Sequence, residues 1–455
     1  MKKYIIALTT LLMFPVISFA QANTTTTPTL NTGDTAWMIV ATALVLFMSI
    51  PGLALFYGGL VRRKNVLNIF MQVFILVAAI SIEWVIIGYS NAFGSNSIEW
   101  LKPYFGGFHW AFLNNIHIGD LSPYFISHSQ TATDGSQIGT IPHIVFVMFQ
   151  GMFAVITPAL IIGAFAERIS FKGFLLFSLL WAVLIYNPVA HWVWSADGWL
   201  YKLGALDFAG GTVVHVNAGA AAIVMAILLG KRRDYKGHAL PPHNITYVAI
   251  GAAMLWVGWF GFNAGSGLAA DGLAGNALMV TNLAAATAAL TWALLEWFID
   301  KRPTTVGIST GAVGGLVAIT PAAGFVSVGG ALAIGIAVSV ICFIMVAYVK
   351  PKLGYDDSLD AFGIHGIGGI LGAILTGVLA TPFVQESYSG SIYGNFHQLW
   401  IQLLATFSTI IFSGIGTFIL FRIIDKLVGI RATDKQEATG LDETLHGETA
   451  YTYFD

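Results

Sequence analysis

The chain has 455 residues, of which 56% are hydrophobic and 10% are charged, and its formal net charge is −2. This composition excludes a disordered chain, the single cysteine excludes a disulfide scaffold, and the lack of a basic block argues against a nucleic-acid-binding protein. A membrane protein with several spans fits, provided that the hydrophobic residues occur in runs of about 20.

The first hydrophobic run is short and follows a positive start. Two lysines precede the apolar residues 4–17, and a small-x-small pattern ends at Ala20. This pattern predicts a signal peptide over residues 1–20, followed by an exported polar arm over residues 21–34. The alternative interpretation is an ordinary first transmembrane helix.

Eleven further hydrophobic segments are each long enough to cross a hydrocarbon core of about 30 Å as a helix. Because the runs are continuous and do not alternate, helices are favoured over a β-barrel. We therefore predict an all-α polytopic membrane protein with eleven transmembrane helices. The segments lie near residues 35–57, 66–91, 141–165, 171–193, 208–229, 245–265, 277–299, 304–322, 326–349, 361–380 and 398–425.

Lysine and arginine are distributed unevenly between the loops that these segments define. If the mature N-terminus lies outside, 17 of the 21 Lys and Arg residues fall on the inner side, and only Lys102 and Lys202 fall outside. Because positive residues are retained in the cytoplasm, this distribution predicts a multi-pass protein of the inner (plasma) membrane. Its N-terminus is expected outside and its C-terminus in the cytoplasm.

The fifth and tenth segments begin with the same spacing of an aspartate and a histidine. His215 follows Asp207 by eight residues, and His365 follows Asp357 by eight residues. Each aspartate can cap the free N–H groups of its helix, and eight residues of helix advance about 12 Å. Since the two segments run in opposite directions, both histidines are expected near the membrane midplane, close enough to touch.

The repeated spacing predicts an inverted repeat and divides the chain accordingly. The predicted units are repeat 1 with helices 1–5 (35–230), repeat 2 with helices 6–10 (245–380), an eleventh helix (398–425) and a polar cytoplasmic tail (426–455). Ionisable residues inside a membrane are costly and therefore candidates for function. The alternative is that each histidine only bridges neighbouring helices.

Several motifs combine glycine, aromatic and polar residues inside the hydrophobic segments. They include Phe149-Gln-Gly-Met-Phe153, Gly163-Ala-Phe-Ala-Glu-Arg-Ile169, Gly258-Trp-Phe-Gly-Phe-Asn-Ala-Gly-Ser266, Thr320-Pro-Ala, Phe362-Gly-Ile-His-Gly366 and the tail sequence His446-Gly-Glu-Thr-Ala-Tyr451. With the segment from Asp207 to His215, these motifs resemble the ammonium transporter family (Amt/Mep/Rh), and within it the bacterial Amt branch. The resemblance covers about residues 34–455.

This resemblance implies uptake of ammonium or methylammonium by a homotrimer with one pore through each subunit. It also implies an inverted 5+5 repeat with the eleventh helix (398–425) packed outside it. The tail (426–455) is then regulatory: it packs against neighbouring subunits, and a P-II-type nitrogen regulatory protein docks at the cytoplasmic face. The implied site residues are Trp194, Phe153, Ser266, Asp207 and Thr320 for substrate binding, Phe153 and Phe262 for a pore gate, and His215, His365 and Trp259 for the pore.

The chemistry of these residue types agrees with transport. An aromatic face attracts a small cation by about 0.5–2 kcal/mol, whereas a charge at the membrane centre costs at least about 3 kcal/mol. We therefore predict that the cation is recruited at the outer mouth, deprotonated, and passed as ammonia along the twin-histidine pore, with separate proton transfer left open. We expect no enzyme activity, no cofactor and no metal site.

Two other functions fit the same pattern. One is an ammonium sensor or receptor that signals through a cytoplasmic P-II-type partner. The other is an Rh-like gas channel, against which Trp194 and the tail argue. For the tail itself, the sequence shows only a polar terminal segment, and such segments are often disordered.

Glu83 is an ionisable residue within the second hydrophobic segment, at a position where the resemblance implies an apolar side chain. It is either a buried, hydrogen-bonded carboxyl at a helix contact or a proton or cation site in the outer half of the membrane. We favour the first interpretation.

Overall fold

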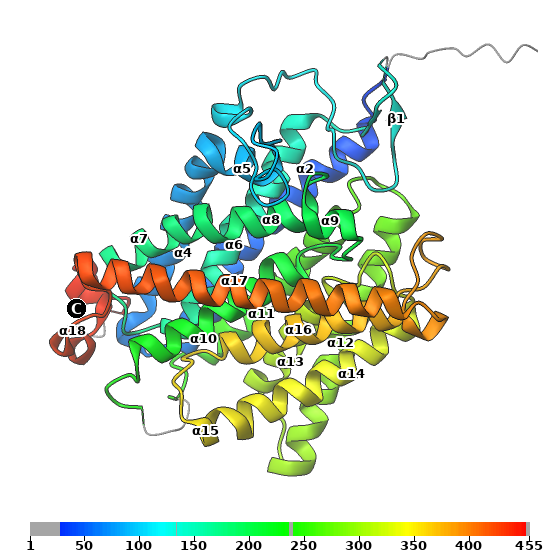
Figure 1. The fold of residues 1–455 in the computed structure, drawn as a ribbon. Helices are drawn as coiled ribbons and strands as arrows, with labels where there is room; N and C mark the ends of the chain where they lie inside the picture. Colours follow the sequence, from blue (N-terminus) through cyan, green and yellow to red (C-terminus); the bar gives the residue numbers. More distant parts are fainter. Residues whose placement is uncertain (1–27, 133, 236–239, 452–455) are drawn as a thin grey trace, which may run out of the picture.

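The computed structural model describes residues 28–132, 134–235 and 240–451 (Figure 1). The predicted signal peptide (1–20) and residues 21–27 of the predicted polar arm lie outside the described residues. The described part is a bundle of helices, with one antiparallel pair of short strands, β1 (Gln130–Thr131) and β2 (Gln137–Ile138), in the loop before α6. The predicted all-α membrane fold is therefore confirmed.

Ten helical segments of the described chain are long and apolar enough to cross a membrane. The segment predicted as the eighth span contains the shorter helix α13 (Thr305–Ile319), whose 15 residues extend about 22 Å. Pro321 follows closely and has no N–H with which to continue the helical hydrogen bonds. The number of eleven spans therefore stays a prediction.

The first five spans combine α-helices with short π- and 3-10-helical segments (η). Span 1 contains α2 (Thr32–Phe47), η1 (Met48–Leu53) and α3 (Ala54–Leu60); span 2 contains η2 (Arg63–Asn65), α4 (Val66–Glu83), η3 (Trp84–Gly88) and α5 (Tyr89–Phe93). Span 3 is α6 (His143–Phe165); span 4 contains α7 (Phe171–Trp181), η5 (Ala182–Tyr186), α8 (Asn187–Trp194) and α9 (Trp199–Leu203); span 5 contains η6 (Gly211–Val216) and α10 (Asn217–Leu229).

The second half of the chain is built in the same way. Spans 6 and 7 are α11 (Ile245–Gly265) and α12 (Gly272–Asp300), and span 9 contains α14 (Val328–Ile344), η7 (Met345–Val349) and α15 (Lys350–Leu353). Span 10 contains η8 (Phe362–Gly366) and α16 (Ile367–Leu379), and span 11 is α17 (Phe396–Val428); the tail carries α18 (Asp434–Thr439) and η10 (Asp442–His446). Two 3-10 turns, η4 (Ala111–Leu113) and η9 (Ser391–Tyr393), lie in loops.

Polar side chains at the helix starts explain where several spans begin. Such a side chain accepts hydrogen bonds from the free N–H groups of the first turn, which have no partner inside the helix. The capping side chains are Asn31 for α2, Ser170 for α7, Asn244 for α11, Asp271 for α12, Thr304 for α13 and Asn395 for α17.

Spans 5 and 10 cross in the middle of the bundle in a reciprocal manner. The start of each packs on the later part of the other, η6 on α16 and η8 on α10, so the two run in opposite directions. Four residues after each histidine stands a glycine: Gly219 lies against Gly366, and a Cβ on Gly369 would lie 2.9 Å from the Cβ of His215. Because neither glycine has a side chain, the two spans approach closely enough to bring the histidines together.

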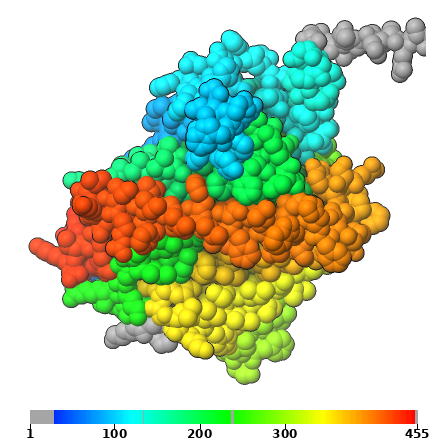
Figure 2. Space-filling view, viewed as in Figure 1, coloured from blue at the N-terminus to red at the C-terminus, as the bar shows by residue number. Residues whose placement is uncertain are grey.

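Helix α17 is the longest helix and lies on the outside of the bundle, where it packs on α7, α10 and α16 (Figures 1 and 2, orange). The tail after it is folded, not disordered, in its described part. The carboxylate of Asp442 accepts hydrogen bonds from the N–H groups of Leu67 (3.1 Å) and Asn68 (2.8 Å), so η10 caps the start of α4. Leu441 is fully buried beside it.

Three arginines and two carboxylates form a largely buried cluster where the described tail meets the bundle, which we call the tail-side ion cluster. Its members are Arg62, Arg168, Arg232, Glu167 and Asp356. Glu167 accepts from Arg62 Nε and Arg232 Nη1, both at 3.0 Å. Arg232 Nη2 also donates to Asp356 at 2.8 Å, and Arg168 Nη1 lies 3.7 Å from the same carboxylate. The cluster ties together the loops after spans 1, 3, 5 and 9.

Candidate functional site

A hollow on the side of the molecule opposite the tail gathers four of the predicted site residues. Phe153, Trp194, Asp207 and Ser266 all line it, although they come from four different spans or loops. The rings of Phe153 and Trp194 meet edge to face, with centroids 5.7 Å apart. Ser266 donates its hydroxyl hydrogen to the carbonyl of Phe262 (2.8 Å), so its oxygen lone pairs stay free to accept a hydrogen bond.

The side chain of Asp207 caps the start of span 5. Its carboxylate accepts four N–H groups, from Gly210 (2.8 Å), Gly211 (2.6 Å), Thr212 (2.8 Å) and Val213 (3.0 Å). The carbonyl of the same residue accepts from Nε1 of Trp194 at 2.9 Å. One aspartate thus caps span 5 and fixes the orientation of the tryptophan in the hollow.

Two phenylalanines close the floor of the hollow. The rings of Phe153 and Phe262 lie 4.3 Å apart between centroids, tilted by 38°, and both residues are 1% exposed. This close contact leaves no gap for a hydrated ion between the rings. The predicted pairing of the two residues is therefore present, in a tilted arrangement.

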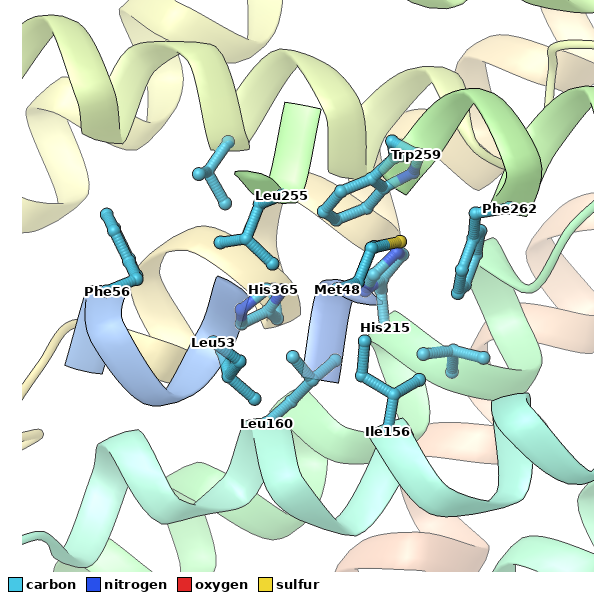
Figure 3. Close-up of a pocket in the computed structure, with 12 residues that line it drawn as sticks. Met48, Leu53, Phe56, Ile156, Leu160, His215, Leu255, Trp259, Phe262 and His365 are labelled. Atoms are coloured by element: carbon cyan, nitrogen blue, oxygen red, sulfur yellow. The ribbon is translucent and has the colours of Figure 1, made fainter. Parts of the chain in front are cut away.

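Beyond Phe262 lies a narrow apolar chamber that contains both histidines (Figure 3). The imidazole rings of His215 and His365 are nearly parallel, 5.4 Å apart and inclined by 13°. Among the described residues, neither nitrogen of His215 has a hydrogen-bond partner, and Nδ1 of His365 has none either. The expected proximity of the two histidines is thus present, with hydrogen-bonding capacity left over.

The rest of the chamber wall is hydrophobic. The other lining residues are Met48, Leu53, Phe56, Ile156, Leu160, Val214, Leu255, Trp259, Phe262 and Val313. None of these described lining residues carries a charge. An ion inside the chamber would therefore have no counter-charge, whereas a small neutral molecule with N–H groups would find two imidazole partners.

Matching local structures hold the two histidines. His215 lies in the π-helical segment η6 and His365 in η8, and π-segments are frequent at functional sites. Asp357 caps η8 as Asp207 caps η6, by accepting from the N–H groups of Ala361 (3.0 Å) and Phe362 (2.8 Å). The two capped starts approach the centre from opposite ends.

Thr320 lies behind the chamber wall and does not line the chamber or the outer hollow. Its hydroxyl accepts from Nε1 of Trp259 (2.8 Å) and donates to the carbonyl of Leu316 (2.7 Å). The ring of Trp259 in turn stacks on His215, with centroids 5.4 Å apart. Thr320 therefore orients Trp259, and the geometry gives it no direct contact with a molecule in the pore.

Tyr57 is a site residue that the sequence analysis missed. Its hydroxyl donates to the carbonyl of Leu160 (3.0 Å) and lies 3.5 Å from Nε2 of His365. It also lines a second hollow, with Asp360 and Ser358, that opens from His365 toward the tail side. A phenol inside a hydrophobic span was the available signal, whereas the apolar lining residues look like any other residues of a buried helix.

Glu83 lies outside both hollows and the chamber. It is 9% exposed, and one of its carboxylate oxygens accepts from Nδ2 of Asn187 at 3.0 Å. This arrangement fits the interpretation as a hydrogen-bonded carboxyl at the contact between spans 2 and 4.

In the described residues, no group of three or more His, Cys, Asp or Glu side chains is placed to hold a metal ion.

A helical membrane bundle with an aromatic mouth, a closed aromatic constriction and a narrow chamber beyond it defines a membrane transport protein of the channel or transporter class. The sequence model of the Ammonium Transporter Family matches residues 36–451. The chain therefore belongs to the ammonium transporter family, as its motifs predict.

Individual relatives support the same assignment. The chain is 49% identical to an ammonium transporter of Bacillus subtilis, over 92% of this chain and 98% of that protein. It is 48% identical to an ammonium transporter of Aquifex aeolicus, over 93% and 94%. The crystal structure of Saccharomyces cerevisiae Mep2 superposes with a TM-score of 0.80 at 35% identity and covers 89% of this chain and 88% of that chain.

Proposed function

We propose that this chain transports ammonium or methylammonium across a membrane and passes it through the chamber as the neutral amine. The observation that carries the proposal is the order of chemistry along the path. A mouth that attracts cations leads to a tight aromatic constriction, and beyond it two imidazoles stand in an uncharged wall.

Recruitment takes place at the outer hollow. The ring of Trp194, which lines the hollow beside Phe153, attracts a small cation, with about 0.5–2 kcal/mol for a cation–π contact. The free lone pairs of Ser266 accept one N–H of that cation. Asp207 adds a negative field, although its oxygens are already occupied by backbone N–H groups.

Deprotonation follows from the cost of charge in the chamber. An unpaired charge at the membrane centre costs at least about 3 kcal/mol, and the described chamber wall offers no carboxylate. Ammonia needs no counter-charge, and the unpartnered nitrogens of His215 and His365 exchange hydrogen bonds with it as it passes. The electrical measurement below decides whether the released proton also crosses.

We further propose the cellular setting that the sequence predicts. The protein is a homotrimer in the inner (plasma) membrane, with the outer hollow outside and the tail in the cytoplasm. The 17 basic residues on the tail side support this orientation. The folded tail beside the cytoplasmic loops offers a surface for a P-II-type regulatory partner. No catalytic reaction is proposed.

Proteoliposomes test the proposal directly. We expect labelled methylammonium to enter liposomes that hold the wild-type protein, and the influx to fall at least ten-fold in His215→Ala. The control His397→Ala changes an exposed histidine at the start of α17 and should leave the influx unchanged. A current with ammonium but not with potassium indicates that a proton crosses as well, and influx without current indicates neutral transport alone.

A receptor is the second candidate function. A protein named "Sensor Amt Protein" superposes with a TM-score of 0.80 at 28% identity and covers 91% of this chain and 98% of that chain. Since a sensor shares this fold, flux has to be measured. Saturable binding of ammonium without methylammonium influx would favour the receptor and contradict the transporter. An Rh-like gas channel predicts ammonia flux that does not depend on Trp194.

A further inference from the structure

Two glutamines of the outer helix α17 contact a segment that lines the outer hollow. Four consecutive residues, 204–207, belong to the wall of this hollow. Gln398 and Gln402 lie one helical turn apart near the start of α17, and both are buried. The side-chain nitrogen of Gln398 donates to the carbonyl of Gly204 (3.0 Å). Although α17 lies outside the bundle, its first turns therefore touch the wall of the recruitment site.

Gln402 holds both backbone groups of Leu206. Its amide oxygen accepts from the N–H of Leu206 (2.7 Å), and its amide nitrogen donates to the carbonyl of the same residue (2.8 Å). The same nitrogen also donates to the carbonyl of Ala373 (3.1 Å) in α16. One side chain thus ties the segment before span 5 to span 10, with both its donor and its acceptor group in use.

Two backbone groups connect Leu206 to Trp194. The peptide group between Leu206 and Asp207 is planar, so a fixed carbonyl of Leu206 also fixes the nitrogen of Asp207. The carbonyl of Asp207 accepts from Nε1 of Trp194 (2.9 Å). Because Leu206 is buried, loss of the glutamine would leave its N–H and carbonyl without partners. The segment would have to shift to find others, and the carbonyl that holds the tryptophan would shift with it.

Helix packing alone does not require these glutamines. Thr406 and Thr409 face the bundle from the following turns of α17, and both are fully buried. Their hydroxyl oxygens have no hydrogen-bond partner among the described residues. The helix therefore packs there without side-chain hydrogen bonds. The contrast indicates that Gln398 and Gln402 serve the segment 204–207.

We propose that Gln402 is a positioning residue for the outer recruitment site. It acts through the backbone of Leu206 and Asp207 to set the orientation of the Trp194 ring, and Gln398 supports the same segment. This inference rests on the proposed function, since it concerns the place where the cation is recruited. Neither glutamine is among the described residues that line the hollow. Their loss should therefore weaken recruitment and leave passage through the chamber unaffected.

Methylammonium influx into proteoliposomes tests the role through a split between half-saturation and maximal rate. Gln402→Met keeps the length of the side chain but removes its N–H and C=O groups. We expect the half-saturating concentration to rise about five-fold, since loss of a whole cation–π contact gives about two- to thirty-fold. The maximal rate per folded protein should stay unchanged. Thr406→Val, one turn along the same helix face, is the control and should leave both quantities unchanged.

A second substitution decides whether Gln402 acts through Trp194. Trp194→Phe keeps an aromatic ring but lacks the indole N–H that binds the carbonyl of Asp207. In this background Gln402→Met should add little to the half-saturating concentration. A full additional rise there, an unchanged half-saturation in the single variant, or a lower maximal rate alone would overturn the proposal. Gln398→Met removes a single hydrogen bond and is the milder variant, with a smaller rise that should also vanish beside Trp194→Phe.

An optical measurement separates this inference from the proposed function. The emission of Trp194 is the difference between the spectra of a protein and of its Trp194→Phe version. We expect this difference spectrum to change in Gln402→Met and to stay the same in Thr406→Val. The readout does not depend on transport. A wild-type protein without influx would therefore contradict the proposed function, whereas an unchanged Trp194 emission in Gln402→Met would overturn the positioning role.

Discussion

The pore chamber and the tail-side ion cluster are both buried and both contain ionisable side chains, but they differ in how these side chains are paired. The carboxylates of the cluster are paired with arginines, although Arg62 Nη2 and Arg168 Nε have no partner among the described residues. In the chamber, three of the four imidazole nitrogens of His215 and His365 have no partner in the described residues. In the cluster, both oxygens of Glu167 are occupied, by Arg62 and Asn65 on one side and Arg232 on the other. Burial alone therefore does not separate the two regions.

The difference indicates which region meets a ligand. Leaving a buried polar group without a partner costs about 1–3 kcal/mol, so folded proteins rarely keep one unless something else supplies the partner at work. In the cluster, ion pairs between arginines and the two carboxylates hold four loops together. The imidazoles of the chamber remain available for a molecule that passes.

Removing one charge from the cluster should have the largest effect on stability. Glu167→Gln keeps the shape of the side chain but turns an acceptor toward Arg62 or Arg232 into an amide donor. Because breaking a buried ion pair leaves its partner uncompensated, we expect a loss of about 3–5 kcal/mol in unfolding free energy. Thermal unfolding in detergent measures this loss. Glu99→Gln, at an exposed position outside the cluster, should change stability little, and an equally stable Glu167→Gln would refute the structural role.

Acid should weaken the same cluster. Burial by itself would raise the pKa of Glu167 and of Asp356, but Arg232, with Arg62 or Arg168, outweighs it and holds both pKa values below their ordinary values. A depressed folded-state pKa gives stability that is present above the unfolded pKa, near pH 4, and is lost as the pH falls through the folded value. We expect an almost constant Tm between about pH 7 and pH 5 and a decline below about pH 4. The decline should be smaller in Glu167→Gln, and an equal decline in both proteins would contradict this assignment.

The sequence predicts the chamber better than it predicts the cluster. The eight-residue spacing from Asp207 to His215 and from Asp357 to His365 is local, so a helical rise is enough to place both histidines at one depth. The partners Glu167 and Arg232 lie 65 residues apart, in loops whose meeting depends on the whole bundle. The periodicity of hydrophobic residues in the sequence does not indicate such a contact.

Among the individual site residues, too, some could be placed from the sequence and others depend on packing between spans. Trp194 and Ser266 could be placed at one mouth because each lies at an end of a predicted span. The second-layer position of Thr320, behind Trp259, depends on how α11 packs on the end of α13, which helix lengths do not reveal. The hydroxyl of Tyr57 near His365 depends in a similar way on the fit between span 1 and span 10.

At the mouth of the pore, a substitution should change the affinity for methylammonium by a smaller amount of free energy. Ser266→Ala removes the oxygen whose lone pairs are free to accept an ammonium N–H. A hydrogen bond to a charged group contributes about 1.5–3 kcal/mol, and a solvated mouth realises the lower end of that range. We expect the half-saturating methylammonium concentration to rise about ten-fold, with the maximal rate unchanged. Ser97→Ala, in the exposed outer loop, is the control; an unaltered half-saturation in Ser266→Ala would exclude this serine from the binding site.

The smallest effect on stability should come from the residue most central to the pore. His215→Leu replaces an imidazole with two unpartnered nitrogens by an apolar side chain of similar size, so it deprives no neighbour of a hydrogen bond. We expect the unfolding free energy to change by less than about 1 kcal/mol, although transport is lost.

His191→Leu is the matched control, because His191 is fully buried and its two nitrogens face the carbonyls of Ala92 (3.0 Å) and Lys102 (2.8 Å). That variant takes the imidazole N–H away from one of these carbonyls and should lose about 1–3 kcal/mol. Thermal unfolding of both variants, beside their methylammonium influx, makes the comparison. If His215→Leu were the more destabilised of the two, the imidazole would be holding the fold together, and its open nitrogens could no longer be taken as the mark of a ligand path.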